Sequence, residues 1–186
     1  MEYQGRSRGL AVEYAILGFL LEAPMHGYEL RDRLAQGLGS FWRVASSQMY
    51  QVLHRLYEQG WVECTTVEAR SAGPSRNVYR TTDTGEEAFW KWATSPVRHA
   101  RQIRIEFLAK VYFLRRSAPD RLAGLVEGQI AVLRRLDDHL KERSSIETDD
   151  AGLGALALSF RRSRIGCTID WLEENKRHLL EGKESN

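Results

Sequence analysis

Three features of the chain predict a mainly α-helical protein in two parts. Residues 46–60 have helical periodicity, residues 61–81 contain two short strand patterns around a turn, and residues 97–186 show helical patterns. A helix followed at once by a hairpin is typical of a winged helix-turn-helix with a two-stranded β wing. We therefore expect a winged-helix DNA-binding domain over residues 1–96 and an α-helical dimerisation and effector-response domain over residues 97–186.

The predicted helix over residues 46–60 is amphipathic. Its apolar residues follow the spacing i, i+3, i+4, i+7 and are Met49, Val52, Leu53 and Leu56. Its opposite face carries Ser47, Gln48, Gln51, Arg55 and Glu58. Ser46 is expected to cap the helix and Gly60 to end it in a left-handed conformation. The polar groups suit phosphates and base edges of DNA, and an ordinary solvated face is the alternative.

The hairpin pattern favours DNA binding over a plain solvated face. Trp61–Val67 and Asn77–Thr81 are rich in β-forming residues, and the loop between them carries Arg70, Ser75 and Arg76. Such a basic loop can reach phosphates beside the groove that the helix occupies. Two strands alone are marginally stable, so the hairpin must pack on neighbouring helices.

Two more helices are predicted upstream. Residues 10–21 are apolar except chiefly for Glu13, which indicates a buried helix, and a second helix is expected over residues 27–36. Tyr28 lies in the first turn of that second helix, where backbone amides and its hydroxyl could bind a phosphate. A core or rim aromatic is the alternative for Tyr28.

Several motifs together resemble the PadR family of transcriptional regulators over residues 10–92. They are Ile16-Leu17-Gly18-Phe19-Leu20, Pro24-Met25-His26-Gly27-Tyr28-Glu29-Leu30, Tyr50 with Leu53, Arg55-Leu56, Gln59-Gly60-Trp61-Val62, and Arg76 with Tyr79, Thr82 and Gly85. The resemblance implies a dimeric repressor that binds a palindromic operator and is released by a small molecule or another signal. The chain departs from the family pattern at Gln51, usually proline, and at Thr81, usually leucine.

The predicted DNA contacts must act locally because the charge is nearly balanced. Residues 1–96 contain 10 Lys and Arg against 11 Asp and Glu, a formal balance of −1 within a chain of +2. We expect the basic side chains Arg6, Arg8, Arg55, Arg70, Arg76 and Arg80 to face DNA, and Glu13, Glu22 and Glu29 to turn elsewhere. The predicted DNA-binding residues are Tyr28, Ser46, Ser47, Gln48, Tyr50, Gln51, Arg55, Arg70, Ser75 and Arg76.

Three helical patterns follow in the second half, at about residues 102–116, 119–143 and 152–181. The last carries two apolar stripes. One contains Leu158, Ile165, Ile169, Leu172 and Leu179, and the other contains Leu156, Phe160, Cys167 and Trp171. One stripe can be buried within the chain, and the other needs a second copy, so the sequence predicts a homodimer interface at Leu156, Phe160, Cys167 and Trp171.

Other chemistry is not indicated. The five histidines lack metal-site spacing and no catalytic motif occurs, so we expect no enzyme activity, no metal and no cofactor. Trp92 and Trp171 are candidates for binding a small aromatic effector, although most tryptophans are core or interface residues. Apolar runs are too short to span a membrane, and a cytoplasmic protein is expected. The rival function is a winged helix that contacts protein and not DNA.

Overall fold

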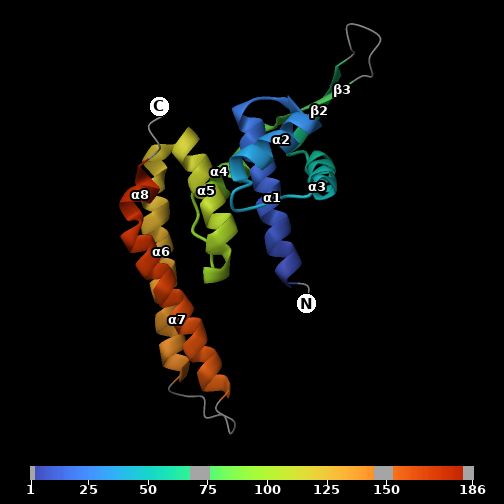
Figure 1. The fold of residues 1–186 in the computed structure, drawn as a ribbon. Helices are drawn as coiled ribbons and strands as arrows, with labels where there is room; N and C mark the ends of the chain where they lie inside the picture. The colour runs from blue at the N-terminus through green and yellow to red at the C-terminus, as the bar shows by residue number, and fades with distance from the viewer. Residues whose placement is uncertain (1–2, 68–75, 145–152, 182–186) are drawn as a thin grey trace. The chain divides into compact units, whose positions relative to one another are not determined.

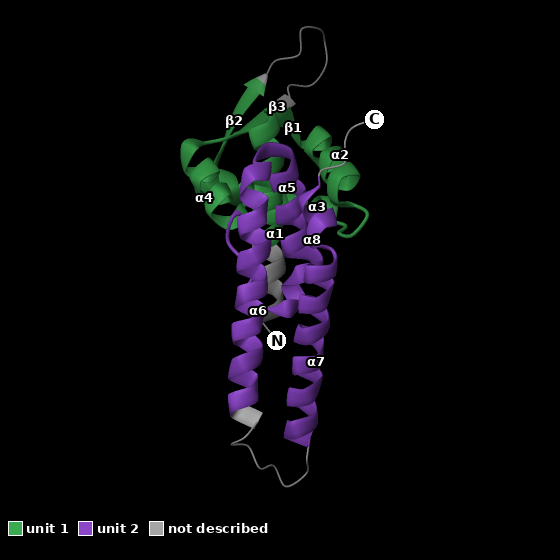
Figure 2. Ribbon diagram, turned by 90° about the vertical axis from the view of Figure 1, so that its left-hand side faces the viewer, with its two compact units in different colours: residues 1–93 green, residues 94–186 purple. Residues whose placement is uncertain are grey.

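The chain forms two compact units, Met1–Ala93 and Thr94–Asn186 (Figure 2). The structure is a computed structural model that describes residues 3–67, 76–144 and 153–181. Helices dominate both units, and a small antiparallel sheet lies in the first (Figure 1). This confirms the predicted mainly α-helical fold with an N-terminal winged helix. Among the described residues, each helix is too short or too polar to cross a bilayer.

The first unit contains four helices and three strands within its described residues. They are α1 (Tyr3–Glu22), β1 (Met25–His26), α2 (Gly27–Leu38), α3 (Ser46–Glu58), β2 (Val62–Val67), β3 (Arg76–Thr81) and α4 (Asp83–Ala93). The predicted two-stranded wing is β2 paired with β3, but β1 adds a third strand on the other side of β3. Two residues are too few for a periodic signal, which is why the sequence pattern missed β1.

Helix α1 runs through the core of this unit and packs against α2, α3 and α4. Its aliphatic residues and Phe19 between Ala11 and Leu20 are almost completely buried, as predicted for this segment. The stripe of α3 is buried too, at Met49, Val52, Leu53 and Leu56. The winged helix therefore has one continuous apolar interior, which fixes which side of α3 faces outward.

Helix α1 begins at Tyr3, seven residues before the predicted start, and the pattern at residues 152–181 is divided into α7 (Leu153–Glu174) and α8 (Lys176–Leu180). The two ends of α3 differ in how well they agree with the sequence patterns. Gly60 has a φ of +71°, and the Gly85 amide donates to the Thr82 hydroxyl over 3.2 Å at the start of α4. The predicted N-cap at Ser46 is wrong. The carbonyl of Ala45 accepts from the Met49 amide at 3.0 Å, so α3 starts one residue earlier and Ser46 is its first residue.

Within its described residues, the second unit contains helices and no strands, and residues 94–99 lead into them without helical structure. Its elements are η1 (Ala100–Gln102), η2 (Ile103–Phe107), α5 (Leu108–Ser117), η3 (Pro119–Arg121), α6 (Leu122–Ser144), α7 (Leu153–Glu174) and α8 (Lys176–Leu180). Helices α6 and α7 lie side by side (Figures 1 and 2). Leu158, Ile165 and Leu172 of α7 are buried, as are Val126, Ile130 and Leu133 of α6. The first predicted stripe of α7 is therefore the internal one.

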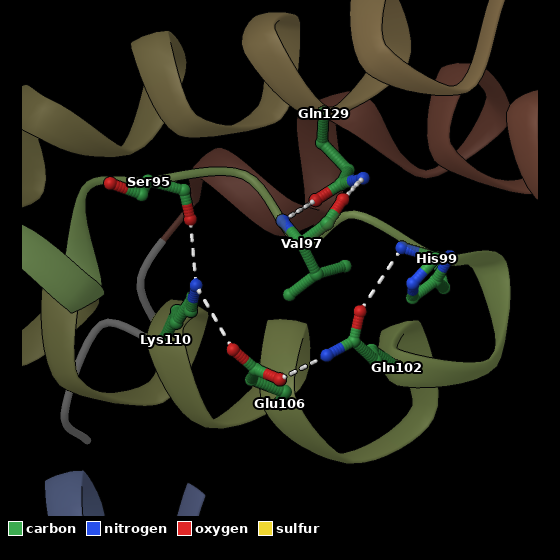
Figure 3. A network of polar contacts seen from close by, with 7 residues as sticks. All are labelled: Ser95, Val97, His99, Gln102, Glu106, Lys110 and Gln129. Atoms are coloured by element: carbon green, nitrogen blue, oxygen red, sulfur yellow. Dashed lines mark hydrogen bonds and ion pairs between the residues drawn. The ribbon is translucent and has the colours of Figure 1, made fainter. Parts of the chain in front are cut away.

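A polar network holds the start of this unit together. It consists of Ser95, Val97, His99, Gln102, Glu106, Lys110 and Gln129 (Figure 3). The fully buried Gln129 side chain accepts from the Val97 amide at 2.7 Å and donates to the Val97 carbonyl at 3.0 Å. The Lys110 ammonium donates to the Ser95 carbonyl at 2.7 Å, and burial lowers its pKa although Glu106 opposes this. Residues 95–97, near the start of the second unit, are therefore held against α5 and α6 of the same unit.

Asp137 connects α6 to α7 through charge. Its carboxylate accepts from the Arg162 Nε at 2.9 Å and pairs with the Lys141 ammonium at 3.0 Å. The hydrogen bond from Arg162 holds the pKa of Asp137 below its usual value of 3.8. Because the folded pKa is depressed, this stabilisation is present above about pH 4 and is lost as the pH falls through the folded pKa.

We expect Asp137→Asn to lower the free energy of unfolding by about 1 kcal/mol at pH 7 and to have little effect at pH 2. Urea unfolding followed by circular dichroism between pH 2 and pH 7 measures both values. Asp138→Asn is the matched control, because Asp138 is exposed and pairs with Lys141 on its own helix. Equal pH profiles for the two variants would contradict the assigned role of Asp137.

Candidate nucleic-acid interface

The outward side of α3 is a continuous polar surface. Its exposed residues are Ser46, Ser47, Tyr50, Gln51, His54, Arg55, Tyr57 and Glu58, and Gln48 is half-buried. Because the apolar stripe is turned into the core, these side chains point away from it. Hydroxyl and amide groups on such a surface can donate to and accept from base edges and phosphates.

Gly27 precedes Tyr28 in the chain and lies against the ring of Tyr50. Both tyrosines are about half exposed. A Cβ atom on Gly27 would lie 2.7 Å from Cε1 of Tyr50. The backbone at the start of α2 is therefore so close to the Tyr50 ring that glycine is the residue that fits at position 27. The His26 ring stacks on Tyr28 at 5.5 Å, and His26 Nδ1 is bonded to the Asn77 carbonyl at 3.1 Å. His26 therefore holds the Tyr28 ring by stacking, and Gly27 limits the position of the Tyr50 ring.

Arg55 has a protein partner on α1. Its Nε and Nη2 atoms donate to Oε1 of Glu13 at 3.0 and 2.7 Å. The expectation that Glu13 turns away from this surface is wrong, because α1 packs on α3 and places the carboxylate beside Arg55. One sequence signal could have found the pair: Glu13 is an acid inside an otherwise apolar helix, and a buried carboxylate needs a partner.

The wing is described only at its strands. The β2–β3 ladder runs from Val62 opposite Thr81 to Val67 opposite Arg76. The predicted DNA-binding residues Arg70 and Ser75 lie outside the described residues, as do the side chains of Arg6, Arg8 and Arg76. Arg80 forms an ion pair with Glu63 on the neighbouring strand.

The two tryptophans proposed for effector binding differ in environment. Trp92 is buried in the first unit and stacks on Tyr14 with ring centroids 5.0 Å apart. Trp171 is partly exposed on α7 in the second unit. Trp92 is therefore a core residue of the winged helix, whereas the Trp171 side chain is accessible at the surface of α7.

The second stripe of α7 is exposed in the single chain. The large apolar side chains of Leu156, Phe160 and Trp171 reach the surface, together with Leu153 and Cys167. Phe160 is 63% exposed and lies beneath the Arg164 guanidinium, whose carbon is 5.8 Å from the ring centroid. A row of exposed apolar residues along one helix is unusual for a surface that meets only water.

Residues 16–91 match the profile described as "Transcriptional regulator PadR-like family". This segment of the chain is a PadR-like domain. A curated relative, the "Negative transcriptional regulator PadR" of Bacillus subtilis (strain 168), is 27% identical, and the match covers 87% of this chain and 93% of the relative. The sequence resemblance to PadR regulators is thereby confirmed.

Solved structures of PadR-like proteins are similar to this chain as well. The crystal structure of Bacillus subtilis PadR in complex with operator DNA is 23% identical, covers 90% of this chain and 98% of its own, and has a TM-score of 0.45. The same protein in complex with p-coumaric acid is 22% identical, with coverages of 92% and 99% and a TM-score of 0.42.

Proposed function

We propose that this PadR-like protein is a dimeric transcriptional repressor that binds a palindromic operator through the outward side of α3. The observation that carries the proposal is the division of α3 into a buried apolar stripe and an exposed polar face. The family match and the curated negative regulator support the regulatory role. The cytoplasm is the expected location, because a regulator of this kind must reach the DNA that it binds.

The chemistry of the face suits base reading. Gln51 presents an amide that can pair with both hydrogen-bonding groups of adenine in the major groove. The hydroxyls of Tyr28 on α2 and Tyr50 on α3, two residues that are each about half exposed, suit phosphate contacts that fix the register. We assign Ser46, Ser47 and Gln48 to the same surface, and the wing residues Arg70, Ser75 and Arg76 to neighbouring phosphates.

Dimerisation makes two such faces available at once. We assign the subunit interface to the exposed stripe of α7, which contains Leu156, Phe160, Cys167 and Trp171. Two α3 helices related by a two-fold axis fit successive major grooves when they are about 34 Å apart. An effector that changes this spacing would release the operator. Trp171 is the better candidate for contacting a small aromatic effector, because Trp92 is enclosed in the core.

A titration across salt concentrations tests the proposal. A fluorescently labelled duplex from the gene's own promoter region is titrated with protein between 50 and 200 mM salt, beside a duplex of shuffled sequence. We expect tighter binding to the promoter duplex and a loss of at least about 10-fold in affinity over this range, because phosphate contacts release counterions. Absence of binding at 50 mM salt would favour the rival function, a winged helix that contacts protein.

A further inference from the structure

The Glu13–Arg55 pair sits where α1 meets the proposed DNA-reading face. The Glu13 side chain is 9% exposed and the Arg55 side chain is 45% exposed. Two of the five N–H donors of the guanidinium point at one oxygen of the carboxylate. Arg55 is therefore oriented by a nearly buried partner while part of its guanidinium still borders solvent.

The ion pair with Glu13 neutralises the positive charge of Arg55 on α3. Arg55 is the single Lys or Arg among residues 46–58, and Glu58 is the single Asp or Glu. With Glu13 included, the formal charge of the group is +1 −2, or −1. The groups left to meet DNA on α3 are the neutral hydroxyls and amides of Ser46, Ser47, Tyr50 and Gln51. Such groups distinguish base edges, and they add little to sequence-independent attraction.

We propose that Glu13 is a positioning residue that sets DNA specificity by holding Arg55 away from phosphates. The inference deepens the proposed function and rests on it. Specificity is the difference between the affinities for operator and for other DNA, and it rises when non-specific binding is weakened. A phosphate that drew Arg55 away would leave the Glu13 carboxylate buried and unpaired, which is costly. Non-specific complexes therefore lack a contact that an unpaired Arg55 would supply.

The test replaces Glu13 by glutamine, which keeps the size and an acceptor oxygen but removes the charge. We expect Glu13→Gln to tighten binding to a duplex of shuffled sequence by about 5-fold at 150 mM salt and to steepen its salt slope by about one. Binding to the promoter duplex should tighten less, so the ratio of the two affinities falls several-fold. A purely structural role for Glu13 would leave the salt slope unchanged.

Two further variants separate this mechanism from general electrostatics. Glu87→Gln removes one exposed negative charge from α4, outside the α3 surface, and leaves the Glu13–Arg55 pair intact, so it should not change the salt slope. Glu13→Gln combined with Arg55→Gln removes both charges of the pair, and we expect the gain in non-specific affinity to disappear. Circular dichroism melts show that each variant is folded.

The outcomes are distinct. If wild-type protein binds neither duplex, the proposed function fails, and the inference fails with it. If wild-type protein prefers the promoter duplex but Glu13→Gln behaves like Glu87→Gln, the function stands and the role of Glu13 is overturned. Persistence of the gain in the double variant would also overturn it, because the effect would then not act through Arg55.

Discussion

Replacing Phe160 by aspartate should convert the dimer into monomers and weaken binding to the promoter duplex by on the order of 100-fold. Phe160 lies near the middle of the exposed α7 stripe, between Leu156 and Trp171. In a dimer closed on this stripe, the new carboxylate would be buried without a partner, which costs several kcal/mol. Separated subunits also lose the avidity of two linked DNA contacts, which is worth about 10²-fold or more. Sedimentation velocity at micromolar concentration and the DNA titration measure the two losses.

Ser159→Asp is the control for this experiment. It introduces the same charge at the neighbouring exposed position, which is not part of the apolar stripe. We expect Ser159→Asp to remain dimeric and to bind DNA within about 3-fold of wild type. A Phe160→Asp protein that sediments as a dimer with unchanged affinity would show that subunits pair through another surface.

Replacing Gly85 by alanine should destabilise the winged helix by about 3 kcal/mol. A Cβ atom there would lie 2.2 Å from the Trp61 carbonyl oxygen and 2.9 Å from Cγ2 of Thr81. The oxygen belongs to the backbone and also accepts from the Thr82 amide at 3.0 Å, so it cannot move without opening the junction between the wing and α4. Thermal and urea unfolding followed by circular dichroism report the loss.

Gly124→Ala is the matched substitution. Gly124 lies within α6, and its added Cβ atom would meet nothing within 4 Å. Alanine in a helix interior is more favourable than glycine by about 0.5 to 1 kcal/mol, so this variant should be slightly more stable than wild type. Similar changes in both variants would contradict the close approach at Gly85.

The features predicted correctly from sequence are those that depend on residues close to one another in the chain. The stripe from Met49 to Leu56 and the left-handed Gly60 depend on neighbouring residues, so periodicity and propensity were sufficient. The hairpin and the two upstream helices were also predicted from such local patterns, and the PadR-like motifs agreed with them. Strand β1 was missed because it exists only through pairing with β3, whose residues lie about fifty positions later in the chain.

Long-range side-chain contacts were not predictable in the same way. The partner of Arg55 is Glu13, which is 42 residues away, and only the packing of α1 on α3 brings them together. The sequence showed two apolar stripes on α7, but only the structure shows that the one containing Ile165 faces inward. The π-helical turn at Ile103–Phe107 was expected as ordinary helix, because apolar spacing does not distinguish the two closely related forms.

The central claim is that two copies of the α3 face enter successive major grooves of one operator. Hydroxyl-radical footprinting of the promoter duplex, at a protein concentration that saturates the titration, tests it most directly. We expect two protected patches on one side of the duplex, with centres about 10 base pairs apart and related by two-fold symmetry. A single protected patch, or uniform cleavage along the bound duplex, would contradict it.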